Sequence, residues 1–170
     1  LRPLPDTRQY DFRSWHHVTP TDPEEDGNPH ARVSHAFTYH DDLDTFILFG
    51  GLCGSCLPVG ADMLSDTWAY DGSSWQALAT VAPPEDMTPT PRKGTGLSYD
   101  AEREVTVLFG GYGGGGFFDD TWEYDGMNWQ EVTTADPEGD GDPLPREFHV
   151  MTYDSGRDYT VLFGGRNGSS

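Results

Sequence analysis

Basic residues and long apolar runs are scarce in this chain of 170 residues, and each shortage excludes a class of partner. Only 10 Lys and Arg stand against 29 Asp and Glu, which gives a net charge of −19. Because so acidic a surface repels nucleic acid and anionic membranes, we expect neither as a partner, and cations are the better expectation. No segment approaches the roughly 18 apolar residues of a membrane-spanning helix, so we also expect no membrane span.

Cysteine is equally scarce, with only Cys53 and Cys56, three positions apart in one loop. Two cysteines are too few for a four-ligand structural zinc site, and no βαβ pattern of a thioredoxin-like motif surrounds them. Two interpretations stay open, a local disulfide formed in an oxidising compartment or two free thiols. The disulfide is our expectation, and it predicts an extracellular or cell-surface location. The first residue is Leu1 rather than Met, so we expect a processed or trimmed product.

Glycine and proline, by contrast, are abundant, with 21 and 13 residues spaced between aromatic and β-branched runs. This composition is typical of short strands joined by tight turns, so we expect an all-β fold. Apolar runs that end in a glycine pair occupy residues 46–51, 105–111 and 159–165. The chain therefore repeats itself, and the period of the repeat can be counted.

Several independent landmarks share that period. Arg32, Arg92 and Arg146 each open a segment that closes with Tyr seven residues later, and they are 60 and 54 residues apart. Residues 66–72 and 120–126 match as Asp-Thr-Trp-x-Tyr-Asp-Gly, and each is followed by a further Trp. Agreement at several positions predicts a repeat protein.

Each repeat predicts four strands. The first runs from Arg to Tyr, and the second is the Leu-Phe-Gly-Gly run, which is apolar on both faces and expected to be the best buried. The third carries Trp and Tyr on one face, and the fourth begins at the following Trp. Asp71-Gly72 and Asp125-Gly126 fall between third and fourth strands, where Asp-Gly favours a tight hairpin.

A glycine pair after an apolar strand, then spaced Tyr and Trp in units of about 50 residues, resembles the kelch repeat of the galactose-oxidase-like propeller superfamily. The resemblance covers nearly the whole chain. It implies a β-propeller, whose blades of four antiparallel strands pack face to face around a channel. We expect an all-β fold with two complete blades, residues 32–78 and 92–132, plus two complementary half-blades, residues 6–18 and 146–165. The landmark residues are then structural, and none is expected to be catalytic.

The two half-blades are expected to complete one another. Asp6 to Asp11, followed by Trp15, aligns with a third and fourth strand, whereas residues 146–165 align with a first and second strand. Three blade equivalents are fewer than the four to eight that usually close a propeller, so we expect copies to join head to tail, as a two-copy ring or as a filament.

Unpaired strand edges would drive this association. The alternative is an excerpt of a longer propeller, cut at these loops. The residues expected at the junction are Asp6, Tyr10, Trp15, Arg146, Phe163, Gly164 and Gly165.

Other functions compete with this assembly role. A glycan- or protein-binding propeller is one alternative. The resemblance also implies a copper oxidase like galactose oxidase, but that activity needs a cysteine-crosslinked Tyr and a Tyr/His copper site, and no such set can be matched here. We also find no nucleophile elbow, phosphate loop or His-Glu-x-x-His pattern, and we expect no enzyme.

The six histidines are candidate ligands or bases. His35 and His149 share a repeat position, which favours a packing role. The remaining four show no ligand spacing and are expected at the surface: His16, His17, His30 and His40.

Two acidic linkers provide the candidate metal ligands. In the second, Asp136, Glu138, Asp140 and Glu147 fall at positions 1, 3, 5 and 12 of an EF-hand-like calcium loop. The first linker offers Asp22, Glu24 and Asp26, with Val33 at position 12. Two interpretations stay open, a weak Ca²⁺ site and a proline-stiffened solvated turn. Calcium is the one cofactor that the sequence suggests.

Overall fold

The structure, a computed structural model, describes residues 3–23, 25–54, 56, 62–78, 88–135, 139 and 141–168. Within these ranges the fold is all-β, and its strands form two antiparallel sheets of four strands and two of two strands. The expected fold class is therefore confirmed. The described residues contain no helix with the length and apolarity that crossing a membrane requires.

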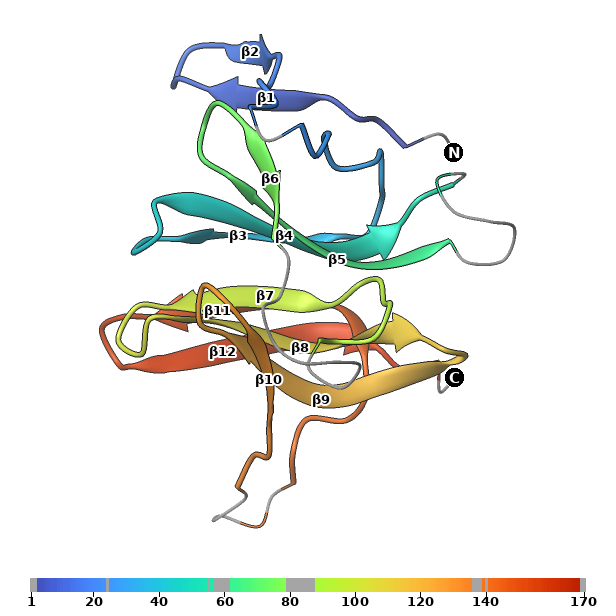
Figure 1. Ribbon diagram of the computed structural model, residues 1–170. Helices are drawn as coiled ribbons and strands as arrows, with labels where there is room; N and C mark the ends of the chain where they lie inside the picture. Colours follow the sequence, from blue (N-terminus) through green and yellow to red (C-terminus); the bar gives the residue numbers. More distant parts are fainter. Residues whose placement is uncertain are drawn as a thin grey trace.

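The two four-stranded sheets are the complete blades, and their strands lie side by side in chain order (Figure 1). The first blade contains β3 (Ala36–His40), β4 (Thr45–Leu52), β5 (Met63–Tyr70) and β6 (Trp75–Ala77). The second contains β7 (Gly96–Asp100), β8 (Val105–Gly113), β9 (Gly116–Tyr124) and β10 (Trp129–Val132). The half-blades are β1 (Thr7–Tyr10) with β2 (Trp15–Val18), and β11 (Glu147–Asp154) with β12 (Tyr159–Arg166).

The second strand of each complete blade is buried, as its apolar sequence predicts. Ile47 and Phe49 of β4 and Leu108 of β8 belong to one core cluster, which also contains Trp122 and Trp129 of the second blade. This core joins residues of β4 and β8, so it fills the space between the blades. Hydrophobic burial in this cluster therefore comes from packing between the blades.

In each complete blade, the first glycine of the pair in the second strand is required by close approach of the next blade. Gly50 and Gly51 have φ angles of 61° and 102°, and the pairing of β4 with β5 shifts register there. A Cβ on Gly50 would lie 2.7 Å from the carbonyl oxygen of Arg92, and the Gly51 N–H donates to that same carbonyl at 2.9 Å. Only glycine accommodates both the backbone conformation and this contact.

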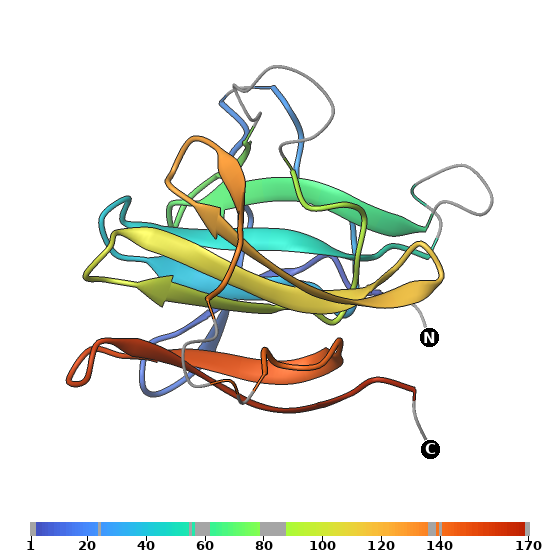
Figure 2. The same cartoon turned by 90° about the horizontal axis from the view of Figure 1, so that it is seen from below.

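The half-blades flank the pair of complete blades (Figures 1 and 2). In β1–β2 Tyr10 pairs with Trp15, just as Tyr70 pairs with Trp75 in β5–β6. At the other side β11 packs against β7, and the Phe148 N–H donates to the Gly94 carbonyl at 2.7 Å. The half-blades therefore take the positions of a third-and-fourth strand pair and of a first-and-second strand pair.

Candidate assembly interface

Neighbouring blades are linked by a repeated tryptophan hydrogen bond. Trp129 Nε1 on the fourth strand of the second blade donates to Thr67 Oγ1 on the third strand of the first, at 3.0 Å. Trp75 Nε1 donates to Thr7 Oγ1 of β1 at 3.1 Å in the same manner. The half-blade β1–β2 is thus docked as the outer half of a preceding blade.

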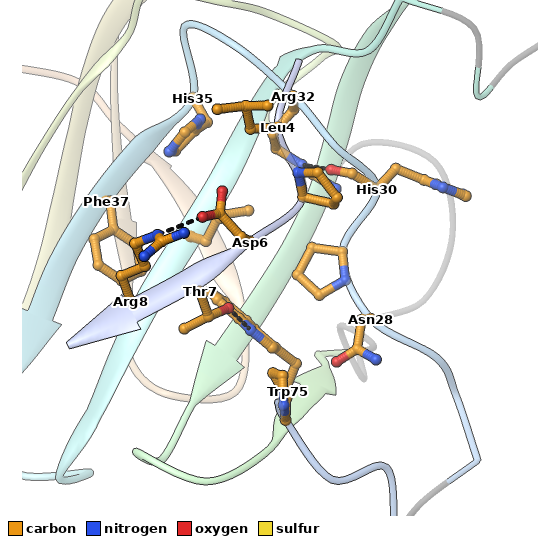
Figure 3. A pocket seen from close by; sticks show the side chains of 14 residues that line it. Leu4, Asp6, Thr7, Arg8, Asn28, His30, Arg32, His35, Phe37 and Trp75 are labelled. Atoms are coloured by element: carbon orange, nitrogen blue, oxygen red, sulfur yellow. Dashed lines mark hydrogen bonds and ion pairs between the residues drawn. The ribbon is translucent and has the colours of Figure 1, made fainter. Parts of the chain in front are cut away.

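A hollow of about 430 Å³ lies beside β1, where the first and second strands of the preceding blade would fall (Figure 3). Asp6 and Arg8 line it from the half-blade, whereas His35 just before β3, Phe37 of β3 and Leu48 of β4 line it from the following blade. Phe37 is about half exposed there, at 47%. In the complete blades the equivalent space is filled by the blade's own first and second strands.

At the other side of the structure, one face of β11–β12 is apolar and uncovered. Val150 pairs with Phe163, and Thr152 pairs with Val161, so these side chains share a face. Phe163 is 77% exposed, although Phe49 and Phe109 at the same repeat position are 0% and 5% exposed. The difference arises because a following blade covers the corresponding face only in the complete blades. The exposed apolar residues of β11–β12 are Phe148, Val150, Tyr159, Val161 and Phe163.

Each complete blade is also held by a buried ion pair. Arg32 Nη1 and Nη2 bind the two carboxylate oxygens of Asp66 at 2.6 and 2.8 Å, and Arg92 binds Asp120 with the same distances. Burial alone would raise the pKa of Asp66, but hydrogen bonds from Arg32 and Trp68 outweigh it and hold that pKa below its usual value. The pair connects the start of the first strand to the third strand.

The junction residues expected from the sequence occur in two separate groups within one chain. Asp6 lies just before β1, and Tyr10 and Trp15 lie in β1–β2, where both aromatic side chains are exposed. Arg146 lies just before β11, and Phe163, Gly164 and Gly165 belong to β12. One chain does not bring the groups together.

Several residues of these surfaces do not stand out in the sequence motifs. Phe37 of β3 and Phe148, Val150 and Val161 of β11–β12 were not singled out. The alternation of side chains along each strand could have identified these four residues, because each lies on the strand face that is turned toward a neighbouring blade in the repeat.

The buried and exposed histidines are not all the ones expected from the sequence. His149 is buried against β7, where a Cβ on Gly96 would lie 2.7 Å from its Nε2, so packing explains its position. His35 lines the hollow. The prediction that His40 is a surface residue was wrong, because it is 2% exposed and covered by Tyr99 of the next blade.

Cys53 and Cys56 are joined by a disulfide, with 5.8 Å between their Cα atoms. Cys53 is itself buried, directly after β4. The bond therefore closes a short loop next to the first complete blade.

The calcium interpretation stays a prediction. Asp136, Glu138, Asp140 and Glu24 lie outside the described residues. Glu147 is buried in ion pairs with Arg166 and Lys93, at 2.9 and 3.5 Å.

In the first linker, Asp22 accepts backbone N–H bonds from Asp26 and Gly27, and Asp26 accepts one from Ala77. Among the residues that the structure describes, no group of three or more His, Cys, Asp or Glu side chains could hold a metal ion.

Comparison with known proteins agrees with this architecture. A search among curated proteins found no match for the chain. A family model described as the KLHDC2/KLHL20/DRC7 Kelch-repeats domain, however, matches residues 6–170, and it spans both complete blades and both half-blades. The chain therefore belongs to the kelch-repeat family, of the KLHDC2/KLHL20/DRC7 type, and its sheets are blades of a kelch propeller.

Proposed function

We propose that this kelch-repeat chain is a non-enzymatic assembly module that associates head to tail with copies of itself. In this arrangement β11–β12 of one copy occupies the hollow beside β1 of a second copy, and the two half-blades make one four-stranded blade. The observation that carries the proposal is the uncovered apolar face of β11–β12, where Phe163 is 77% exposed.

The face that would receive β11–β12 is complementary in chemistry. Between the complete blades, Ala36 of β3 and Leu97 of β7 belong to the same core cluster. By the same repeat geometry, the face of β11 that carries Val150 would meet the opposite face of β3, which carries Phe37. Apolar side chains that are exposed in both half-interfaces would be buried together.

The unpaired strand edges match as well. In the complete blades, Phe49 of β4 pairs with Thr67 of β5, and Phe109 of β8 pairs with Thr121 of β9. The corresponding pair at the junction would be Phe163 of one copy and Thr7 of the other. Backbone hydrogen bonds between β12 and β1 would then continue the sheet by strand addition.

The balance of burial and association entropy favours a closed ring. Burying five apolar side chains at about 1.5–3 kcal/mol each gives on the order of 10 kcal/mol per junction. The loss of rigid-body freedom on association costs a similar amount, about 4–15 kcal/mol. One junction is therefore marginal, whereas the second junction of a two-copy ring forms within the same particle and avoids a second such loss. Such a ring has six blades, within the range that propellers adopt.

The mass of the native particle tests the proposal. We expect light scattering after size-exclusion chromatography to give twice the chain mass of 18.8 kDa, over a hundredfold dilution series. Very large particles or fibres would mean that junctions form without closing the ring. A folded monomer at every concentration would contradict self-association.

A matched pair of variants identifies the surface involved. Phe163→Asp places a charge on the uncovered face of β12 and should give a folded monomer. Met127→Asp makes the same change at an exposed residue of the β9–β10 turn and should leave the mass unchanged. Equal behaviour of the two variants would argue against β12 as the contact.

We also propose that the module works in an oxidising compartment, at or outside the cell surface. The disulfide between Cys53 and Cys56 supports this location, because such bonds persist where thiols are not kept reduced.

A further inference from the structure

The arginine that opens each complete blade is held by three kinds of partner. Arg92 Nε donates to the Thr90 carbonyl at 3.0 Å, Nη1 donates to the Gly110 carbonyl at 3.0 Å, and Nη1 and Nη2 both reach the carboxylate of Asp120. Trp122 Nε1 adds a hydrogen bond to Asp120 Oδ2 at 2.7 Å. Arg32, Asp66 and Trp68 repeat this arrangement in the first blade.

Arg146 opens the half-blade β11–β12 and makes two of the three kinds of contact. Its Nε donates to the Leu144 carbonyl at 2.9 Å, and its Nη1 donates to the Gly164 carbonyl at 3.0 Å. The guanidinium is thus held as in Arg32 and Arg92. Among the described residues of one chain, however, no carboxylate binds it.

Asp6 is a carboxylate that lacks, within the described ranges of the chain, the arginine found at the equivalent position of the complete blades. It occupies the repeat position of Asp66 and Asp120, just before the third-strand equivalent β1, and it lines the hollow. Arg8 occupies the position of Trp68, and its Nε donates to Asp6 Oδ2 at 2.6 Å, as Trp68 Nε1 donates to Asp66 Oδ2 at 2.7 Å. Figure 3 shows Arg8 reaching Asp6 in this way within the hollow. In the described part of one chain, Oδ1 of Asp6 receives no arginine, although Oδ1 of Asp66 does.

We propose that Asp6 of one copy and Arg146 of a second copy form a bidentate ion pair that selects the partner and fixes the register of the completed blade. This inference rests on the proposed self-association. The pair forms only at one register, because Arg146 is held by its own carbonyl contacts and Asp6 is held by Arg8. A partner shifted by two residues along β1 would leave Arg146 without a carboxylate, and Asp6 with Arg8 alone, in a site that the contact removes from water, which is unfavourable.

Two single charge reversals and their mixture test the pair. Asp6→Arg alone would oppose Arg146, and Arg146→Glu alone would oppose Asp6, so each should weaken self-association by at least about thirtyfold. In an equimolar mixture, one junction joins Arg at position 6 to Glu at position 146, and the next joins native Asp6 to native Arg146. The mixture should therefore restore the wild-type mass, measured by sedimentation across a dilution series.

Controls separate charge from folding. Glu102→Arg makes the same charge change as Asp6→Arg at an exposed residue of the β7–β8 turn, and it should associate like the wild type. Melting curves report whether each variant is folded, and Asp6→Asn, which keeps the side-chain shape, should weaken association less than Asp6→Arg.

The outcomes are distinguishable. A wild-type chain that stays monomeric overturns the proposed function and this pair with it. A wild type that associates, with reversal variants that associate equally well, overturns the pair alone. Folded variants that dissociate and do not recover on mixing show that the two residues do not contact each other, which also overturns it.

Discussion

His40 is a buried residue at the end of β3 whose ring packs on Tyr99, with 4.2 Å between the ring centroids. Within the described residues neither of its ring nitrogens has a hydrogen-bond partner. Burial lowers the pKa of His40, and the nearby Asp42 and Asp41 oppose this shift without reversing it. The fold therefore accommodates the neutral ring better than the imidazolium.

This placement predicts a pH-dependent stability. Because the folded pKa of His40 lies below the unfolded value of about 6.5, the unfolded chain binds the extra proton first. The contribution of neutral His40 to the free energy of unfolding should be fully present above pH 6.5. It should decrease as the pH falls from 6.5 toward the folded pKa. His40→Phe should reduce this decrease, as measured by urea unfolding at pH 7.5, 6.5 and 5.5.

His35 and His149 also have pKa values lowered by burial, so the variant should retain part of the dependence. His17→Phe, at an exposed site, should behave like the wild type. An unchanged pH dependence in His40→Phe would count against the account given for this residue.

The disulfide gives a second prediction at the same scale. Alkylation of the unfolded, unreduced protein should add no alkyl group at Cys53 or Cys56, and alkylation after reduction should add two, as read from the intact mass. Two groups added without reductant would mean free thiols and would remove the support for an oxidising compartment.

Within each blade, the buried ion pair stabilises the connection between first and third strands. Arg92 is 1% exposed, and its guanidinium also lies 4.1 Å from the ring centre of Phe118. Arg92→Met would leave the Asp120 carboxylate with the Trp122 N–H but without its cation, and should lower the free energy of unfolding by about 3–5 kcal/mol.

The matched control is Arg157→Met. Arg157 also pairs with a carboxylate, that of Asp154, but the two side chains are 69% and 29% exposed, so the change should cost less than about 1 kcal/mol. Urea unfolding of the two variants measures the difference. Similar losses in both would show that burial does not decide the strength of these pairs.

The strands were largely predictable because the repeat supplies several copies of each signal. Glycine pairs, Asp-Gly turns and paired Tyr and Trp each mark the same point in successive blades, and Gly72 and Gly126 indeed have φ angles of 95° and 92°. The half-blades followed from the same alignment, since Tyr10 and Trp15 have the spacing of Tyr70 and Trp75.

Contacts between blades were less predictable, because they join residues about one repeat apart. His40 has Asp100 and Asp154 at its repeat position, a polar set that suggests exposure. Asp100 is nevertheless buried, as is His40, because the first strand of the next blade covers both. The surface of β12 was predicted only in part. The repeat alignment placed Phe163 at the junction, but its exposure does not follow from its local sequence, which is the same as that of the buried Phe49 and Phe109.

At the scale of the whole molecule, the net charge of −19 opposes compaction. Screening by salt should relieve this repulsion, because the Debye length is about 10 Å at 0.1 M. We therefore expect the melting temperature to rise between low and physiological NaCl concentrations. A melting temperature independent of salt would mean that the carboxylates are already neutralised locally.

Calcium binding can be separated from this general effect of salt on the melting temperature. The calcium hypothesis for the acidic linkers predicts a further rise with millimolar CaCl₂ over NaCl of matched ionic strength, by mass action on the folded state. EDTA should reverse the rise, and the double variant Asp136→Asn, Asp140→Asn should lack it. Superimposable curves at matched ionic strength would contradict calcium binding.

The tryptophan hydrogen bond between blades always runs in one direction, from Trp75 to Thr7 and from Trp129 to Thr67. At the proposed junction it would run from Trp15 to Thr121, so the junction would use the same contact as the boundaries within the chain. Duplication or loss of one whole repeat would leave both terminal half-blades unaltered. Relatives with different repeat numbers could then co-assemble, and the curvature contributed by each blade, rather than recognition between ends, would determine the circumference of the particle.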